Sequence, residues 1–224
     1  MHSVKEQVEY LSKFVTDYKN DLFHRLAAER TSYVTIVLED LYQQHNCSAV
    51  LRSCDCFGIQ HVHVIENMNS FTDNSEISMG AADWLTVHRH KKNKNNTLET
   101  IKMLKSQGYR IMATTPHERD AFVDDVDLEK GKMAFFMGTE LTGLSNDVLS
   151  NADEFVKIPM YGFTESYNVS VCAALLMYSV VQRLRKSNVN WHLSEEEYYQ
   201  VLFAWYKHSI KASGQILRRF NDEE

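Results

Sequence analysis

Glycines and hydrogen-bonding side chains concentrate in one window of the chain, residues 137–170. The chain has only eight glycines and two prolines, yet Gly138, Gly143, Gly162 and Pro159 all fall inside this window. The window also carries side chains that can hydrogen-bond a polar ligand: Thr139, Glu140, Thr164, Glu165, Ser166 and Asn168. Because glycine and proline at strand ends usually mark a backbone that contacts a ligand, we expect the active site here.

Three of the strands that we expect end in residues suited to ligand binding. In a parallel α/β sheet, ligands bind beyond the carboxyl ends of the strands. The expected strands at 109–114, 133–137 and 155–158 run into Thr115-Pro116, Gly138-Thr139-Glu140 and Pro159-Met160. The sequence has no G-x-G-x-x-G, no G-x-x-x-x-G-K-[ST] and no G-x-S-x-G, so dinucleotide, P-loop and α/β-hydrolase sites are disfavoured.

Strand and helix patterns alternate through the middle of the chain. Runs of apolar and β-branched residues predict strands, and 3.6-residue spacing predicts helices at 46–57, 97–107 and 168–186. The expected strands lie at 33–38, 61–65, 109–114, 133–137 and 155–158. Gly58 and Gly108 are expected to end the first two helices. This alternation favours an α/β fold with a mostly parallel sheet, in which the polar stretch 67–96 is the least ordered.

Helical segments flank the α/β region at both ends. Residues 4–26 predict one amphipathic helix. Ser194 and Glu197 form a capping-box pattern at the start of a C-terminal helix. We therefore divide the chain into an N-terminal helical extension (1–30), an α/β domain (31–186) and a C-terminal helical extension (187–224).

Composition limits the class of protein. The 224 residues are 44% hydrophobic and 24% charged, which is ordinary for a globular domain. No apolar run is long enough to span a bilayer and the first ten residues lack the apolar stretch of a signal peptide, so we expect a cytoplasmic protein without membrane contact. The net charge of −6 argues against nonspecific coating of nucleic acid and confines any RNA contact to local basic faces.

The cysteines do not form a disulfide framework in a chain of this size, and we expect reduced thiols at all four: Cys47, Cys54, Cys56 and Cys172. Cys54 and Cys56 precede His61 and His63, which raises a metal-site interpretation. This C-x-C…H-x-H run lacks the C-x₂₋₄-C spacing of structural zinc sites. We therefore expect no metal.

Three groups of residues resemble the motifs of the SPOUT methyltransferases. These are Asn46-Cys47-Ser48-Ala49-Val50-Leu51-Arg52, then 137–145 (MGTELTGLS), then Ile158-Pro159-Met160 with 166–170 (SYNVS). All three occur in the family's order, and the resemblance covers about residues 31–186. It is strongest to the TrmH branch, whose members methylate ribose 2′-hydroxyls of RNA with S-adenosyl-L-methionine. The flanking helices look like those of the tRNA guanosine-18 2′-O-methyltransferases in that branch.

The resemblance implies an α/β domain with a C-terminal trefoil knot, a homodimer, and a cofactor held by backbone groups of the knot loops. Periodicity alone does not predict a knot. By matching motif positions, the cofactor-binding residues are Thr114, Gly138, Ile158, Met160, Tyr167 and Asn168. Arg52 matches the catalytic arginine, and the polar residues around it are Asn46, Glu140, Ser166 and Asn168. Tyr167 departs from the family, whose members often carry leucine there.

The implied chemistry needs no metal, because methyl transfer from a sulfonium is an in-line displacement that depends on positioning. The ribose 2′-hydroxyl becomes a good nucleophile only as its proton is drawn away. Since arginine stays charged, we interpret Arg52 as orienting the hydroxyl and stabilising developing alkoxide, with a substrate phosphate as a possible helper. Structural alternatives stay open: Arg52 as a surface ion-pair residue, Glu140 as a helix N-terminal charge, Asn168 as a helix cap.

These expectations add up to S-adenosylmethionine-dependent ribose 2′-O-methylation of tRNA, most simply at guanosine 18 of the D-loop. The alternatives are the same reaction on ribosomal RNA, or a non-catalytic RNA-binding module that keeps the fold. The short N-terminal segment is too small for the separate substrate domain that rRNA-acting relatives often carry. Candidate RNA-binding residues are Arg25, Arg30, Arg89, Lys91 and Lys92, for which a solvated surface is the alternative.

Overall fold

The computed structural model describes residues 2–116, 120–139 and 141–222, and these form two compact units. One unit joins the two ends of the chain, residues 1–31 and 192–224, and the other comprises residues 32–191. Within the described residues, no helix is long and apolar enough to cross a membrane.

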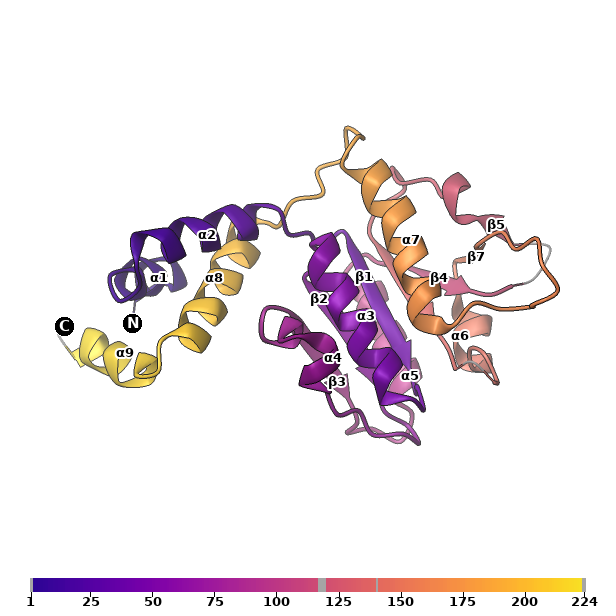
Figure 1. Ribbon diagram of the computed structural model, residues 1–224, viewed down its shortest axis with the longest axis horizontal. Helices are drawn as coiled ribbons and strands as arrows, with labels where there is room; N and C mark the ends of the chain where they lie inside the picture. Colours follow the sequence, from indigo (N-terminus) through magenta and orange to yellow (C-terminus); the bar gives the residue numbers. More distant parts are fainter. Residues whose placement is uncertain (1, 117–119, 140, 223–224) are drawn as a thin grey trace. The chain divides into compact units, whose positions relative to one another are not determined.

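A seven-stranded sheet forms the centre of the larger unit (Figure 1). Its strands are β1 (Val34–Glu39), β2 (His61–Ile65), β3 (Thr86–His90), β4 (Arg110–Thr114), β5 (Ala121–Phe122), β6 (Met133–Met137) and β7 (Glu154–Lys157). They lie in the order β3-β2-β1-β6-β4-β7-β5, and every pair is parallel. The predicted α/β fold with a mostly parallel sheet is confirmed, and all carboxyl ends of the strands meet at one edge.

Helices cover both faces of this sheet. In Figure 1, α3 (Gln44–Phe57) and α7 (Val169–Leu184) lie across the near face, and α5 (Asn96–Ser106) and α6 (Asn146–Asn151) lie behind it. Every residue of β1 and β6 is buried, because strands covered on both faces need apolar side chains on both. Ile36 and Leu38 pack toward α3 and α7, whereas Val37 packs toward α5.

Glycine ends two of these helices as predicted. Gly58 follows α3 with φ +76° and Gly108 follows α5 with φ +81°, the left-handed conformation that lets the chain leave a helix. Short elements complete the unit: α4 (Ser75–Ser78) and two 3₁₀ turns, η1 (Ala81–Asp83) and η2 (Val123–Asp125).

One expectation for the secondary structure was incomplete and one was wrong. The stretch 67–96, expected to be the least ordered, holds α4, η1 and strand β3, which the sequence patterns do not predict. The single helix expected at 4–26 is two helices, α1 (Val4–Ser12) and α2 (Asp17–Ala28). Thr16 separates them because its extended backbone and its side chain, which accepts a hydrogen bond from the Lys19 amide, begin a new helix.

The smaller unit is a helical cluster of α1, α2, α8 (Glu195–Ser209) and α9 (Ser213–Asp222). Ser194 and Glu197 make the predicted capping box at the start of α8. Phe23 meets the rings of Trp205 and Tyr206 edge-on, with centroid separations of 5.7 and 5.3 Å. Aromatic burial of this kind supplies the apolar core that holds these helices together.

Four histidines form a stack on the α5 face of β2 and β3. His63 lies against His88 with ring centroids 4.6 Å apart. His61 Nδ1 pairs with His88 Nε2, and His63 Nδ1 with His90 Nε2, each at 3.0 Å. The cysteines of the C-x-C run do not join this stack. The Cys54 thiol is buried against the Met177 sulfur, and Cys56 is exposed. Among the described residues, no three potential metal ligands converge.

Candidate active site

A cavity of about 350 Å³ opens at the carboxyl ends of β4, β6 and β7, beside the first turns of α7. Four of the predicted cofactor-binding residues after β6, after β7 and in β4 line it directly: Thr114, Gly138, Ile158 and Met160. Tyr167 and Ser166, just before α7, line it as well. Its walls mix methionine and aliphatic side chains with threonine hydroxyls and backbone groups, and its volume falls within the range of small-molecule sites.

The loop after β6 closes tightly on itself at Gly138. Thr139 and Gly143 exchange two backbone hydrogen bonds, of 3.1 and 2.9 Å, and Gly143 has φ +68°. A Cβ added to Gly138 would lie 2.3 Å from the carbonyl carbon and oxygen of Gly143. No side chain fits there, so glycine at this position lets two backbone segments approach each other at the wall of the cavity.

A buried carboxylate fixes the far end of this loop. Glu39, the last residue of β1, is 4% exposed. It accepts hydrogen bonds from the Ser145 amide (2.9 Å), from the Ser145 hydroxyl (2.6 Å) and from the Thr97 hydroxyl (2.8 Å). Ser145 in turn begins α6. Glu39 was not predicted, although an acidic residue at the end of a mostly apolar strand is the signal that marks it.

Thr114 joins β4 to β6 at the floor of the cavity. Its hydroxyl donates to the Phe136 carbonyl at 2.6 Å and lies 3.1 Å from the Met137 sulfur. This pairing uses the hydroxyl proton within the sheet, so Thr114 offers a bound molecule mainly its backbone and methyl group.

The segment between β7 and α7 is fastened by Tyr167. The Tyr167 hydroxyl donates to the Pro159 carbonyl at 3.2 Å, which joins the two ends of the segment. Since Tyr167, Ile158 and Met160 all line the cavity, the hydrogen bond holds one wall of it in place.

Asn46 and Asn168 meet next to the cavity. The Asn168 side-chain amide donates to Asn46 Oδ1 at 3.1 Å, and Asn46 is only 8% exposed. Asn168 also accepts from the Ser170 amide at 2.9 Å and so caps α7. The Asn168 side chain therefore caps α7 and also ties the start of α3 to the start of α7.

Arg52 lies apart from this cavity. It is exposed on α3, six residues after Asn46, which is about 9 Å along the helix axis at 1.5 Å per residue. It does not line the cavity, and within the described part of the chain it makes no hydrogen bond or ion pair. Glu140, the remaining predicted catalytic residue, lies outside the described residues.

Cys172, from the first turn of α7, also lines the cavity. Burial raises the pKa of its thiol to about 11, so the sulfur stays protonated near neutral pH. A neutral thiol is a weak nucleophile, and Cys172 therefore contributes packing rather than covalent chemistry.

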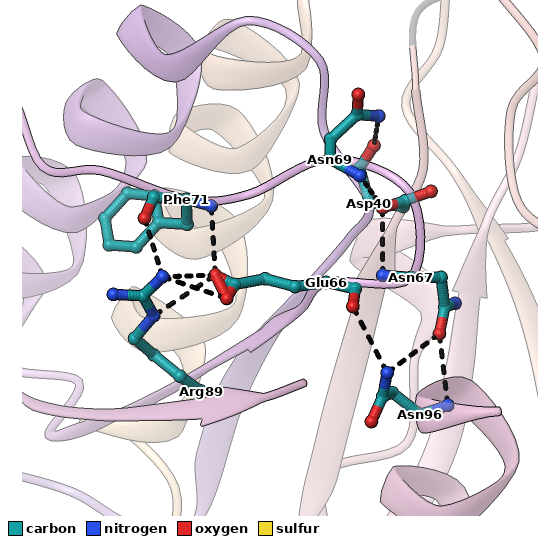
Figure 2. Close-up of polar contacts among 7 residues, drawn as sticks. All are labelled: Asp40, Glu66, Asn67, Asn69, Phe71, Arg89 and Asn96. Carbon is teal, nitrogen blue, oxygen red and sulfur yellow. Dashed lines mark hydrogen bonds and ion pairs between the residues drawn. The ribbon is translucent and has the colours of Figure 1, made fainter. Parts of the chain in front are cut away.

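The candidate RNA-binding residues have different environments. Arg25, Lys91 and Lys92 are exposed. Arg30 is 5% exposed and lies over the Trp205 ring at 5.2 Å, so it has little surface to offer RNA. Arg89 is bound within the protein, as Figure 2 shows: its guanidinium donates to both Glu66 carboxylate oxygens and to the Phe71 carbonyl.

The ion pair of Arg89 with Glu66 is partly shielded from solvent. The Glu66 side chain is 4% exposed and that of Arg89 is 39% exposed. Burial alone would raise the pKa of Glu66, but hydrogen bonds from Arg89 and from the Phe71 amide outweigh it and hold that pKa below its ordinary value. Glu66 is therefore ionised at neutral pH and keeps Arg89 in place.

Comparison with known proteins connects this cavity to one family. The SpoU rRNA Methylase family matches residues 33–178. A tRNA (guanosine(18)-2′-O)-methyltransferase of Borreliella burgdorferi is 42% identical over 208 residues, which cover 93% of each chain. The protein of the same name from Thermus thermophilus is 30% identical over 85% of this chain and 96% of its own.

Solved structures show the same fold. A TrmH/SpoU tRNA modifying enzyme of A. aeolicus superimposes with a TM-score of 0.76 at 23% identity, covering 87% of this chain and 98% of its own. AviRb of Streptomyces viridochromogenes, a SpoU methyltransferase crystallised with AdoMet, gives a TM-score of 0.60 at 21% identity over 70% of this chain and 63% of its own. At these identities the two structures support the fold.

Proposed function

The chain belongs to the SpoU rRNA methylase family, and on that premise we propose that it is an S-adenosylmethionine-dependent tRNA (guanosine-18-2′-O)-methyltransferase. The observation that supports tRNA as the substrate is the 42% identity, over 93% of both chains, to a protein named for that reaction. Ribosomal RNA is the less favoured substrate, because the relatives that match most of this chain are named for tRNA.

The cavity at β4, β6 and β7 fits S-adenosyl-L-methionine. Its 350 Å³ volume suits a nucleoside with a short side chain, and its walls offer both apolar surface and backbone hydrogen-bonding groups. Gly138 leaves no side chain where the loop backbone closes, which allows close approach by a ligand. We assign cofactor contacts to Thr114, Gly138, Ile158, Met160 and Tyr167, with Asn168 holding the end of the wall.

The bound cofactor supplies an electrophilic methyl group on a sulfonium. The chain supplies position, because the 2′-hydroxyl must lie in line with that methyl group and polar side chains must hold it there. We assign this to Ser166, Asn46, Asn168 and Glu140. The hydrogen bond between Asn46 and Asn168 fixes the orientation of both amides. A phosphate of the bound RNA takes up the hydroxyl proton, and cationic Arg52 stabilises the developing alkoxide.

The position of Arg52 supports a homodimeric enzyme. Arg52 is exposed and does not line the cavity of its own chain, so we propose that it completes the site of a second subunit. Exposed apolar side chains on α7 provide a contact surface: Val171 (46% exposed), Leu175 (40%) and Tyr178 (62%) share one side of the helix. A two-fold dimer uses the same patch on both chains.

We also propose that the region after β6 forms a trefoil knot. Two features support it. Strand β6 lies between β1 and β4 although it follows both in sequence, and the loops after β6 and β7 line one cavity. The proposed place of action is the cytoplasm, where tRNA is processed.

The function is tested by incubating the purified protein and labelled S-adenosylmethionine with unmodified tRNA or, separately, with ribosomal RNA. We expect label in the ribose of the D-loop guanosine at position 18. Label only in ribosomal RNA would retain the chemistry and overturn the substrate. No label, with cofactor still bound, would favour a non-catalytic RNA-binding module.

A matched variant tests the role of Arg52. We expect Arg52→Ala to lose at least about 100-fold in kcat, the scale of an oxyanion-stabilising donor, while its affinity for the cofactor is retained. Mixing Arg52→Ala chains with Gly138→Ala chains, which we expect to bind cofactor poorly, tests the shared site. Recovery of activity requires one subunit to complete the other, and absence of recovery contradicts it.

A further inference from the structure

A lysine-rich loop follows β3, and nothing in the assigned active site uses it. Lys91, Lys92 and Lys94 are all exposed, between the end of β3 and the start of α5. Within the described residues, none of the three makes an ion pair. Lys91 is near enough to Glu66 to help lower the pKa of that carboxyl, yet it forms no ion pair with it. Three ammonium groups without an ion pair within four residues, in a chain of net charge −6, form a local positive surface.

Two carboxylates at the same edge, those of Asp40 and Glu66, accept hydrogen bonds from groups within the protein. Glu66 binds Arg89 and the Phe71 amide. Asp40 Oδ1 accepts from the amides of Asn67 (3.1 Å), Met68 (2.8 Å) and Asn69 (2.8 Å), contacts that Figure 2 shows in part. These acidic groups hold the loop after β2 and leave the lysines as the charge presented to solvent.

Arg89 is partly exposed, but its guanidinium is engaged by an internal carboxylate, unlike the three lysines. His88 and His90 point to the α5 face of β3 and join the histidine stack. Arg89 points to the opposite face and binds Glu66. The basic side chains of β3 are therefore structural, and the cationic surface begins after the strand, at Lys91.

A chain of hydrogen bonds ties the lysine loop to the cofactor loop. The Asn93 amide donates to Asn96 (3.0 Å) and the Asn96 amide to Asn67 (3.0 Å), as Figure 2 shows for the second pair. Asn67 donates to Thr97 (2.9 Å), which donates to Glu39 (2.8 Å), and Glu39 binds Ser145. The lysine loop therefore has a fixed position relative to the loop that begins at Gly138.

The sheet sets the separation between the two. All strands are parallel, so the lysine loop and the cavity lie on the same edge. From β3 to β6 and β4 there are three and four strand spacings, about 14 and 19 Å at ~4.8 Å each.

We propose that Lys91, Lys92 and Lys94 form a phosphate-binding surface that holds the tRNA backbone a few nucleotides from the ribose being methylated. The proposal rests on the proposed function, which supplies the RNA and the position of the reacting ribose. RNA is the occupant because the proposed function brings an RNA backbone to this edge of the sheet, and because three clustered ammonium groups bind phosphates as point charges. The carboxylate-fastened loop after β2 keeps this surface in register with the cavity.

The test is steady-state kinetics of the full-length protein with tRNA at several salt concentrations. We expect the variant Lys91→Ala/Lys92→Ala/Lys94→Ala to raise the KM for tRNA at least about tenfold and to reduce the slope of log KM against log salt by up to about 2. The kcat at saturating tRNA and the Kd for S-adenosylmethionine should be unchanged. The charge-preserving variant Lys91→Arg/Lys92→Arg/Lys94→Arg should restore the KM and the salt slope.

Lys130→Ala/Lys186→Ala is the matched control. Both lysines are exposed, and they precede β6 and follow α7, at the opposite edge of the sheet. This control should leave the KM unchanged. If the unaltered protein methylates tRNA and the triple alanine variant keeps its KM and salt slope, this inference is wrong and the proposed function stands. If the unaltered protein transfers no methyl group to tRNA, the proposed function fails first.

Discussion

The two halves of the sheet's carboxyl edge are fastened in different ways. In the half formed by β4, β6 and β7, loops are held by backbone hydrogen bonds, such as the pair between Thr139 and Gly143. In the half formed by β1, β2 and β3, loops are held by carboxylates: Asp40, Glu66 and Asp73 each accept two or more hydrogen bonds. One half therefore encloses a cavity with its backbone, and the other displays a surface.

This difference follows from what each half must contact. A cavity wall for a small molecule benefits from exposed peptide groups and missing side chains, since both allow close approach. A surface that binds a polyanion benefits from cations without counter-ions. Nearby carboxylates must then be bound to other groups within the protein. Glu39 sits at the boundary, because it binds Thr97 on one side and Ser145 on the other.

The largest expected effect comes from adding a methyl group to the loop after β6, in the half formed by β4, β6 and β7. Gly138→Ala places a Cβ 2.3 Å from backbone atoms of Gly143, so the loop has to move. We expect S-adenosylmethionine to bind at least about 100-fold more weakly, since one misplaced cavity wall forfeits several contacts. Isothermal titration calorimetry measures this directly.

Gly162→Ala is the control for this variant. Gly162 belongs to the segment after β7, and its added Cβ would be 4.0 Å from the nearest atom, the Thr164 amide nitrogen. We expect its cofactor affinity to be close to that of the unaltered protein. Equal losses in both variants would mean that the tight closure at Gly138 is not what shapes the cavity.

A second effect separates the two halves. Glu66→Ala leaves Arg89 without its carboxylate and the loop after β2 without its anchor. Breaking a buried pair costs about 3–5 kcal/mol, which we reduce to about 2 kcal/mol because Arg89 is partly exposed. Chemical denaturation should show this loss, and the KM for tRNA should rise while the Kd for the cofactor is retained. A matching loss of cofactor affinity would show that the halves do not act separately.

Sequence reasoning succeeded where local pattern and burial agree. The apolar runs that became β1 and β6 are buried on both faces, and such strands need no information from elsewhere in the chain. The motif residues Gly138 and Tyr167 line the cavity, and their contact with the cofactor remains a prediction.

The failures share one physical cause. Strand β3 carries alternating histidine and arginine side chains. The histidines pair with histidines of β2, and Arg89 pairs with Glu66, which follows β2 directly. A polar edge strand looks like a basic surface loop when its partners are unknown. The ion pair of Arg89 with Glu66 and the hydrogen bonds of Glu39 likewise join residues far apart in the sequence, and neither was predicted. An RNA contact of Arg89 remains a prediction.

The histidine stack predicts a pH dependence on the β1–β3 half. Burial, followed by the neighbouring imidazoles, lowers the pKa of His63 to about 2, and burial lowers those of His88 and His90. Below the unfolded pKa of about 6.5 the unfolded chain binds protons that the folded chain refuses, so stability falls as pH falls. His63 alone should cost about 1.4 kcal/mol per pH unit in this window.

Thermal unfolding between pH 7.5 and pH 5 measures this effect. The variant His63→Phe keeps an aromatic ring in the stack but cannot titrate, so its melting temperature should fall less steeply over the same range. An unchanged slope in the variant would assign the acid sensitivity to other groups. Because the stack lies on β2 and β3, the loss of stability at low pH should weaken tRNA binding at a higher pH than it weakens cofactor binding.

The smallest expected effect concerns Tyr167, whose side chain helps to hold one wall of the cavity. Its hydroxyl donates to the Pro159 carbonyl and its ring lines the cavity. Tyr167→Phe removes a partly exposed hydrogen bond of about 1 kcal/mol and should weaken cofactor binding about fivefold. Tyr167→Leu removes the ring as well. If the two variants bind equally, the hydrogen bond accounts for the contribution of Tyr167; if only Tyr167→Leu binds weakly, the ring does. Unaltered affinity in both variants would mean that the backbone alone orders this segment.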